Sequence, residues 1–147
     1  MISLIVTGHG RFASGLLGAV EQVFGPQAQA VAVDFPPELG TAELEAHLNA
    51  AVASLPAGAG IVFLTDLLGG SPFKLASQIA LAQSQPCDVI AGSNMAMFAE
   101  VALERDEIAG VGDFVTRAQA AGRAGVASLR ERLARQQARA SAQDDGL

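Results

Sequence analysis

A histidine stands between two glycines where an apolar run ends, and it is the first candidate for chemistry. Residues 4–7 are Leu-Ile-Val-Thr, and Gly8-His9-Gly10 follows directly. A short run rich in Ile and Val that stops at glycines before an amphipathic segment predicts a buried strand, a tight turn and a helix. His9 would then lie at the carboxyl edge of a parallel sheet, where ligands bind in open α/β folds. This position suits a nucleophile, because the glycines let a ligand approach the backbone closely.

A carboxylate follows a second apolar run in the same way. Residues 61–66 form the most apolar predicted strand, which ends at Asp66. If the strand order is 2-1-3-4, the first and third strands are neighbours, and His9 and Asp66 lie side by side. A carboxylate that accepts the hydrogen of one ring nitrogen fixes the tautomer and leaves the other nitrogen free to attack an electrophile. The pair therefore predicts a nucleophile, His9, with an orienting carboxylate, Asp66.

The surroundings of this pair suggest a phosphoryl group as the electrophile. One helix is expected after Gly10 and another at Ser71-Pro72, where Ser71 is the predicted N-cap and Pro72 the first helical residue. Helix starts offer unpaired N–H groups and partial positive charge, and an arginine can clamp a phosphate. The predicted phosphoryl-binding residues all lie at these starts: Gly10, Arg11, Gly69, Gly70 and Ser71. We expect no metal ion and no cofactor, so the phosphoryl group would come from another phosphoprotein.

The elements that must position these residues alternate between strand and helix. Strands are predicted over residues 2–7, 30–35, 61–66 and 87–91, and helices over 12–24, from 41 onward, and over 71–84 and 95–104. This alternation predicts an α/β fold: a doubly wound, mostly parallel sheet in the order 2-1-3-4 with helices on both faces. Residues 113–137 permit helix, and they form either one bent helix or a helix followed by a short extra strand.

Composition limits the class of protein. With 147 residues, the chain is expected to form one domain over residues 1–135, followed by a flexible tail over 136–147. A net charge of -6 argues against a general nucleic-acid binder. No apolar run approaches the ~20 residues of a membrane span, and no signal peptide is evident. Together with a single cysteine, Cys87, which cannot form an internal disulfide, these features predict a cytoplasmic protein.

Three stretches of the sequence resemble a known family. Residues 5–10 (Ile-Val-Thr-Gly-His-Gly), residues 63–73 (Phe-Leu-Thr-Asp-Leu-Leu-Gly-Gly-Ser-Pro-Phe) and residues 92–94 (Gly-Ser-Asn) look like the mannose-type IIA components of the bacterial phosphoenolpyruvate-dependent sugar phosphotransferase system. The resemblance covers roughly residues 1 to 130, and the Asp-x-x-Gly-Gly-Ser-Pro-Phe block is its most specific part. Thr-Gly-His-Gly and Val-Asp-Phe-Pro are most similar to the N-acetylgalactosamine-type members.

The resemblance implies a function and a set of partners. His9 matches the family's phosphorylated histidine, which takes its phosphoryl group from the small carrier HPr and passes it to a histidine of a IIB component. Asp66 matches the carboxylate that bonds the phosphorylated ring, and Ser71 matches a hydroxyl near the phosphoryl group. A homodimer that exchanges an antiparallel strand, a separate IIB protein and indirect contact with the membrane IIC and IID components are further expectations. The system would take up and phosphorylate a hexose or an amino sugar.

Three alternatives remain open at this stage. Residues 8–13 fit the dinucleotide-binding pattern Gly-x-Gly-x-x-Gly/Ala, and Asp34 ends the second strand about where a ribose-binding acid belongs. That interpretation leaves the Asp66 to Pro72 block unexplained. The phosphocarrier subunit of dihydroxyacetone kinase resembles the same family, although Ser-Pro-Phe after Gly-Gly favours the sugar branch. The third alternative is a regulatory module that is phosphorylated on His9 but discharges no IIB protein.

Overall fold

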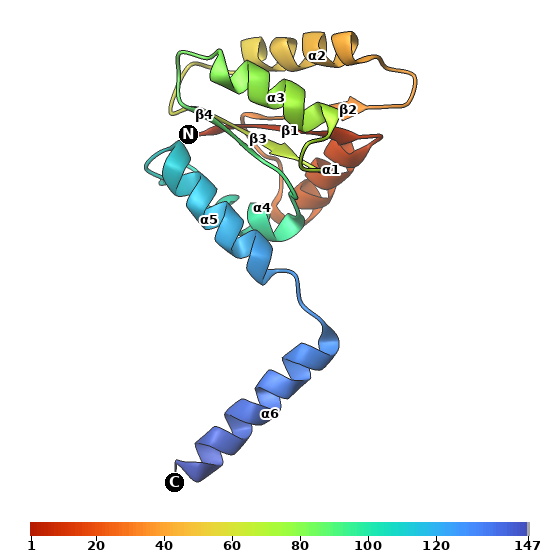
Figure 1. The fold of residues 1–147 in the computed structure, drawn as a ribbon. Helices are drawn as coiled ribbons and strands as arrows, with labels where there is room; N and C mark the ends of the chain where they lie inside the picture. Colours follow the sequence, from red (N-terminus) through yellow and green to blue (C-terminus); the bar gives the residue numbers. More distant parts are fainter. Residues whose placement is uncertain (147) are drawn as a thin grey trace.

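The structure, a computed structural model, describes residues 1–146 (Figure 1). The strands are β1 (Ser3–His9), β2 (Ala30–Phe35), β3 (Ile61–Thr65) and β4 (Cys87–Ile90). The helices are α1 (Phe12–Phe24), α2 (Thr41–Ser54), α3 (Ser71–Leu81), α4 (Met95–Val101), α5 (Val111–Ala124) and α6 (Leu129–Asp145). Strand and helix alternate as predicted, although α3 and α4 each end three residues earlier than expected.

The four strands form one parallel sheet in the order β2-β1-β3-β4. The predicted α/β fold, its parallel sheet and its strand order are therefore confirmed. In the register of the sheet, His9 pairs with Phe35 on one side and Thr7 pairs with Thr65 on the other. The carboxyl ends of β1, β2 and β3 consequently meet at one edge, because parallel strands that start in register also end together.

Helices cover both faces of the sheet, as Figure 1 shows. Helices α2 and α3 pack on one face, where Leu44, Leu48 and Ile79 join Ile5 and Phe63 in a buried cluster. Helices α1, α4 and α5 cover the other face, and their cluster is the larger one, with members such as Val20, Phe98 and Phe114. Both faces of β1 and β3 are thus buried, which is why β3 is almost continuously apolar and β1 has the apolar run Leu4-Ile5-Val6 at its centre.

The C-terminal segment differs from one of the two predicted alternatives. Residues 126–128 connect α5 to α6, and within residues 1–146 no strand follows α5, so the described residues form the helical alternative. Helix α6 begins at a capping box, in which Ser128 accepts a bond from the Glu131 N–H and the Glu131 side chain accepts one from the Ser128 N–H. Of the predicted tail over residues 136–147, residues 136–145 continue this helix, and residue 147 lies outside the described residues.

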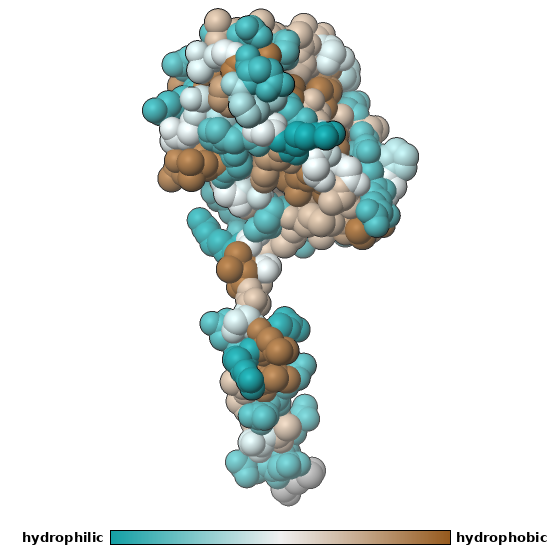
Figure 2. All heavy atoms as spheres, turned by 90° about the vertical axis from the view of Figure 1, so that its right-hand side faces the viewer, coloured by the Kyte–Doolittle hydropathy of each residue, from teal (hydrophilic) through white to brown (hydrophobic). Residues whose placement is uncertain are grey.

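Helix α6 projects from the rest of the molecule and has no buried residue (Figures 1 and 2). Three apolar side chains lie exposed along the connection and the first turns of α6: Val126, Leu129 and Leu133. No helix within residues 1–146 is both long enough and apolar enough to cross a membrane.

Candidate phosphoryl-transfer site

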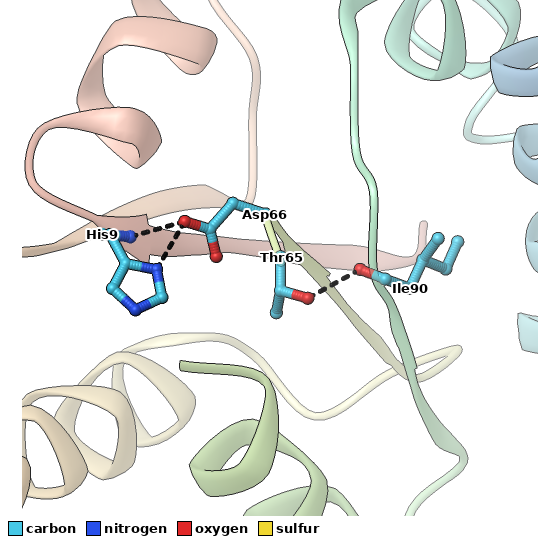
Figure 3. Close-up of polar contacts among 4 residues, drawn as sticks. All are labelled: His9, Thr65, Asp66 and Ile90. Carbon is cyan, nitrogen blue, oxygen red and sulfur yellow. Dashed lines mark hydrogen bonds and ion pairs between the residues drawn. The ribbon is translucent and has the colours of Figure 1, made fainter. Parts of the chain in front are cut away.

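The structure brings His9 and Asp66 together at the carboxyl ends of β1 and β3 (Figure 3). One carboxylate oxygen, Asp66 Oδ2, lies 2.8 Å from the His9 backbone nitrogen and 2.8 Å from His9 Nδ1. An ionised carboxylate only accepts hydrogen bonds, so Nδ1 carries the ring hydrogen and Nε2 keeps its lone pair. The His9 side chain is 48% exposed against 18% for Asp66, so the free nitrogen belongs to a ring that another molecule can reach.

The Asp66 carboxylate is held in its ionised form. Burial raises the pKa of this group, but hydrogen bonds from the His9 backbone, the His9 ring and the Leu67 backbone, together with the charge of His9, lower it by more. The net effect is an Asp66 pKa below the ordinary value of 3.8. At neutral pH the site therefore has a permanent negative charge beside Nδ1, where positive charge develops when Nε2 attacks an electrophile.

The main chain beside Asp66 is anchored to the end of β4. Thr65 is fully buried, and its hydroxyl donates to the carbonyl oxygen of Ile90 at 3.1 Å (Figure 3). The Gly92 N–H donates to the Asp66 carbonyl, and the Ser93 N–H donates to the Thr65 carbonyl. The residues after β4 thus fix the backbone from which the carboxylate projects.

Two glycines leave the space that the pair occupies. A Cβ atom on Gly70 would lie 2.8 Å from His9 Cε1, and a Cβ atom on Gly8 would lie 2.4 Å from Phe12 Cδ1 and 2.9 Å from Asp66 Cγ. Real Cβ atoms do not approach other atoms so closely. A larger residue at either position would therefore force a neighbouring side chain to shift: the imidazole at Gly70, and Phe12 or the carboxylate at Gly8.

Sequence reasoning missed one neighbour of the histidine, Phe35 at the end of β2. Its ring centroid lies 5.9 Å from that of the His9 imidazole, with the planes tilted by 51°. The Gly10 N–H donates to the Phe35 carbonyl at 2.7 Å, and the Phe35 N–H donates back to the Gly10 carbonyl at 3.1 Å. The sequence offers two hints: Phe35 ends the strand predicted to lie beside β1, and it belongs to the Val-Asp-Phe-Pro stretch that resembles the family.

Asp34 has a structural contact that weakens the dinucleotide-binding alternative. Its two carboxylate oxygens accept bonds from the Ser14 backbone N–H at 2.9 Å and from the Ser14 hydroxyl at 2.6 Å. Asp34 thereby caps the first turn of α1 from the neighbouring strand. An acid that is already used in this way is not free to bind the two hydroxyls of a ribose.

The predicted phosphoryl-binding residues lie near His9, but not all of their side chains are held by contacts. Gly70 lies beside the imidazole, with Gly69 and Ser71 on either side of it at the start of α3, and Gly10 follows His9 in the chain and bridges to Phe35. Arg11 is an exposed residue at the N-cap of α1, and its side chain makes no hydrogen bond or ion pair within residues 1–146. A role for Arg11 as a phosphoryl clamp stays a prediction.

The prediction that Ser71 caps α3 is wrong. The N-cap is Gly70, no side chain bonds the first turn, and Ser71 is the first helical residue. The helix begins one residue early because Gly70 itself takes the extended cap conformation, with φ -69° and ψ 166°. The Ser71 hydroxyl is consequently not needed for capping.

Replacing Ser71 with alanine should therefore change stability by less than about 0.5 kcal/mol. Asn94→Ala is the matched control, because the Asn94 side chain caps α4 by accepting a bond from the Met97 N–H at 3.2 Å. We expect that variant to lose about 1 kcal/mol. Urea denaturation of both variants checks the difference, and a loss of stability in Ser71→Ala equal to that in Asn94→Ala would restore the capping role.

Comparison with known proteins identifies the family. The sequence pattern of the family described as "PTS system fructose IIA component" matches residues 3–119. The mannose-specific EIIAB component of Escherichia coli K12 is 35% identical over 129 residues, or 88% of this chain. The chain spans 40% of that relative's length. The fructose-specific EIIA component of Bacillus subtilis 168 is 32% identical over 109 residues, which is 74% of each protein.

Solved structures of phosphotransferase components share the fold. EIIA from Streptococcus agalactiae superposes with a TM-score of 0.82 at 28% identity, covering 89% of this chain and 99% of the other. The mannose/sorbose-specific IIA subunit from Enterococcus faecalis superposes with a TM-score of 0.76 at 29% identity, covering 86% of this chain and 93% of the other. With the family pattern, these matches show that the chain belongs to the mannose/fructose-type IIA components of the sugar phosphotransferase system.

Proposed function

We propose that this chain is a phosphocarrier that receives a phosphoryl group on His9 from phospho-HPr and passes it to a separate IIB component. The observation that carries the proposal is the contact between His9 Nδ1 and Asp66 Oδ2 at 2.8 Å. This contact leaves Nε2 as the nucleophilic nitrogen of an exposed ring. The phosphohistidine mechanism makes the chain a phosphotransferase, with His9 as nucleophile and Asp66 as the orienting carboxylate.

The bonds and charges of the transfer are balanced without a metal ion or an additional general acid. The Nε2 lone pair forms a bond to phosphorus while the nitrogen–phosphorus bond of phospho-HPr breaks, and the departing nitrogen keeps that electron pair. The His9 ring becomes positively charged, and Asp66 stabilises it through the hydrogen on Nδ1. In the second transfer, a IIB histidine attacks the same phosphorus and His9 leaves as the neutral imidazole.

The phosphoryl oxygens would lie near the start of α3. Gly69 and Ser71 supply backbone N–H groups there, and the helix dipole is positive at this end, whereas the Gly70 N–H already donates to the Leu67 carbonyl at 3.0 Å. Because Gly70 would contact the imidazole at Cε1 if it had a side chain, its backbone stays within reach of the ring. Gly10 and Arg11, at the start of α1, complete the proposed phosphoryl-binding set.

The proposed partners follow from the family and from exposed surfaces beside the site. Leu67 and Leu68 are 63% and 73% exposed and line a pocket of about 580 Å³ next to Asp66, an apolar surface suited to docking HPr and IIB.

A homodimer is supported by the free edge of β4 and by exposed apolar residues beyond α5. Contact with the membrane IIC and IID components would be indirect, through IIB. A carrier that exchanges phosphoryl groups with HPr would act in the cytoplasm, in the uptake of a hexose or an amino sugar.

Association with HPr should depend on salt. The chain has a net charge of -6, so a carrier with a basic face would be steered to it electrostatically. Raising the ionic strength from roughly 0.05 to 0.5 M shortens the Debye length to a few ångströms and should slow association roughly tenfold. Stopped-flow measurements across this range test the effect, and an association rate that does not change with salt would exclude steering.

The test of the proposed function is phosphorylation in a reconstituted relay. The protein is incubated with phosphoenolpyruvate, enzyme I and HPr, and its intact mass is compared with that of His9→Ala. We expect the wild type alone to gain one phosphoryl group, which acid removes as it does from a phosphohistidine. Adding a IIB protein should then discharge it. An unmodified wild type beside charged HPr would overturn the proposal, and a phosphorylated protein that no IIB discharges would indicate the regulatory alternative.

A further inference from the structure

The His9 imidazole is enclosed on three sides by different parts of the chain. Asp66 holds the ring at Nδ1, and Gly70 closes the side of Cε1, where even a methyl group would not fit. The Phe35 ring lies on a third side, with 5.9 Å between the ring centroids. The hydrogen bonds to Asp66 fix the backbone nitrogen and Nδ1, but a ring held at one atom can still tilt about that bond.

Phe35 is itself rigidly placed. Two backbone hydrogen bonds join it to Gly10, the residue after the histidine, and its neighbour Asp34 is bonded twice to Ser14 in α1. The next residue is Pro36, which restricts Phe35 to an extended backbone. The Phe35 side chain also packs against the buried cluster between the sheet and α2. A ring held in this way can restrain its neighbour, because moving it would disturb the end of β2.

We propose that Phe35 is a positioning residue that restrains the His9 ring and so aims Nε2 at the incoming phosphorus. The proposal rests on the proposed phosphocarrier function for its kinetic consequence, but the restraint itself is a property of the unphosphorylated protein. Aromatic pairs with tilted planes at centroid distances of 4.5–7 Å attract one another, so the contact favours one ring orientation. Misplacing a reacting group by about 1 Å can cost a reaction as much as 10²-fold.

The test replaces Phe35 with leucine, which keeps an apolar side chain but removes the aromatic ring. Phe24→Leu is the matched control. Phe24 is also a half-buried phenylalanine, but it lies at the C-terminal end of α1 and packs against the larger cluster. Both variants should lose similar stability. We expect Phe35→Leu to lower the maximal rate of phosphoryl transfer from phospho-HPr about tenfold, with an unchanged KM for HPr, whereas Phe24→Leu leaves both unchanged. Phe35→Tyr should restore most of the rate.

The unphosphorylated protein gives an independent readout. NMR relaxation of the His9 ring C–H groups should show greater ring mobility in Phe35→Leu than in the wild type or Phe24→Leu. If the wild type is not phosphorylated at all, the proposed function fails, but the ring mobility still shows whether Phe35 restrains the His9 ring. Unchanged ring mobility and an unchanged transfer rate in Phe35→Leu would overturn the proposal. A higher KM with an unchanged maximal rate would also overturn it, because Phe35 would then contact HPr instead of restraining His9.

Discussion

Replacing Asp66 with alanine should leave a folded protein that accepts a phosphoryl group about 10- to 100-fold more slowly. The carboxylate accepts hydrogen bonds from the His9 backbone and from Nδ1 through one oxygen. Without it, the ring hydrogen is free to move to Nε2, and no charge stabilises the cationic ring formed in the transfer. The cost to stability should be about 1 kcal/mol, because a strand-end hydrogen bond is lost. Rapid-quench measurement of transfer from phospho-HPr gives the rate, and circular dichroism checks the fold.

Asp66→Asn separates charge from shape in this experiment. Asparagine has the same size, and its amide oxygen can take the place of Oδ2 and accept from both the His9 backbone N–H and Nδ1, so that only the negative charge beside the cationic ring is lost. We therefore expect Asp66→Asn to be about as slow as Asp66→Ala while being at least as stable. A folded Asp66→Ala protein with a normal transfer rate would remove Asp66 from the mechanism. A fast Asp66→Asn beside a slow Asp66→Ala would mean that the position of the ring matters and the negative charge does not.

Sequence patterns were sufficient for the sheet and for the central pair of the site. Helix α1 occupies the predicted residues 12–24, because its apolar spacing is regular and Gly25-Pro26 ends it. The order β2-β1-β3-β4 follows from alternating strands and helices with short connections. Once that order is fixed, His9 and Asp66 end neighbouring strands, so their proximity follows from topology alone. Long, regular elements are predictable because each of their residues contributes to one repeating pattern.

Contacts that depend on tertiary packing were not predictable in the same way. Ser71 followed by Pro72 has the sequence pattern of a cap, yet the backbone turns one residue earlier, at Gly70, against the His9 ring. Phe35 belongs to the Val-Asp-Phe-Pro stretch, but that pattern gave no sign of a contact with His9, because the contact depends on the register between β1 and β2. Residues after Gly125 were equally ambiguous: their few apolar side chains fit a strand or a helix, and the helix that they form, α6, has no buried residue.

Gly70→Ala adds only one methyl group, but it should disturb the site strongly. The added methyl carbon would lie 2.8 Å from His9 Cε1 and 3.3 Å from the carbonyl oxygen of Leu67. The imidazole must then move away from the start of α3, and the bond between Nδ1 and Asp66 must lengthen or bend. We expect phosphoryl transfer to fall by about 10²-fold, since a displacement near 1 Å is enough for such a loss. The rate is measured as for Asp66→Ala, and the loss should appear in the maximal rate.

Gly40→Ala is a close control for that substitution. Gly40 is the N-cap of α2, its φ of -80° and ψ of 165° nearly equal those of Gly70, and a methyl group there meets nothing within 4 Å. Both variants carry the same small cost of alanine at an N-cap, so any further difference between them comes from the contact with His9. Equal transfer rates in the two variants would show that the ring yields to the methyl group without losing its alignment. A slow Gly70→Ala beside a normal Gly40→Ala would instead show that this glycine is needed because of the histidine's position.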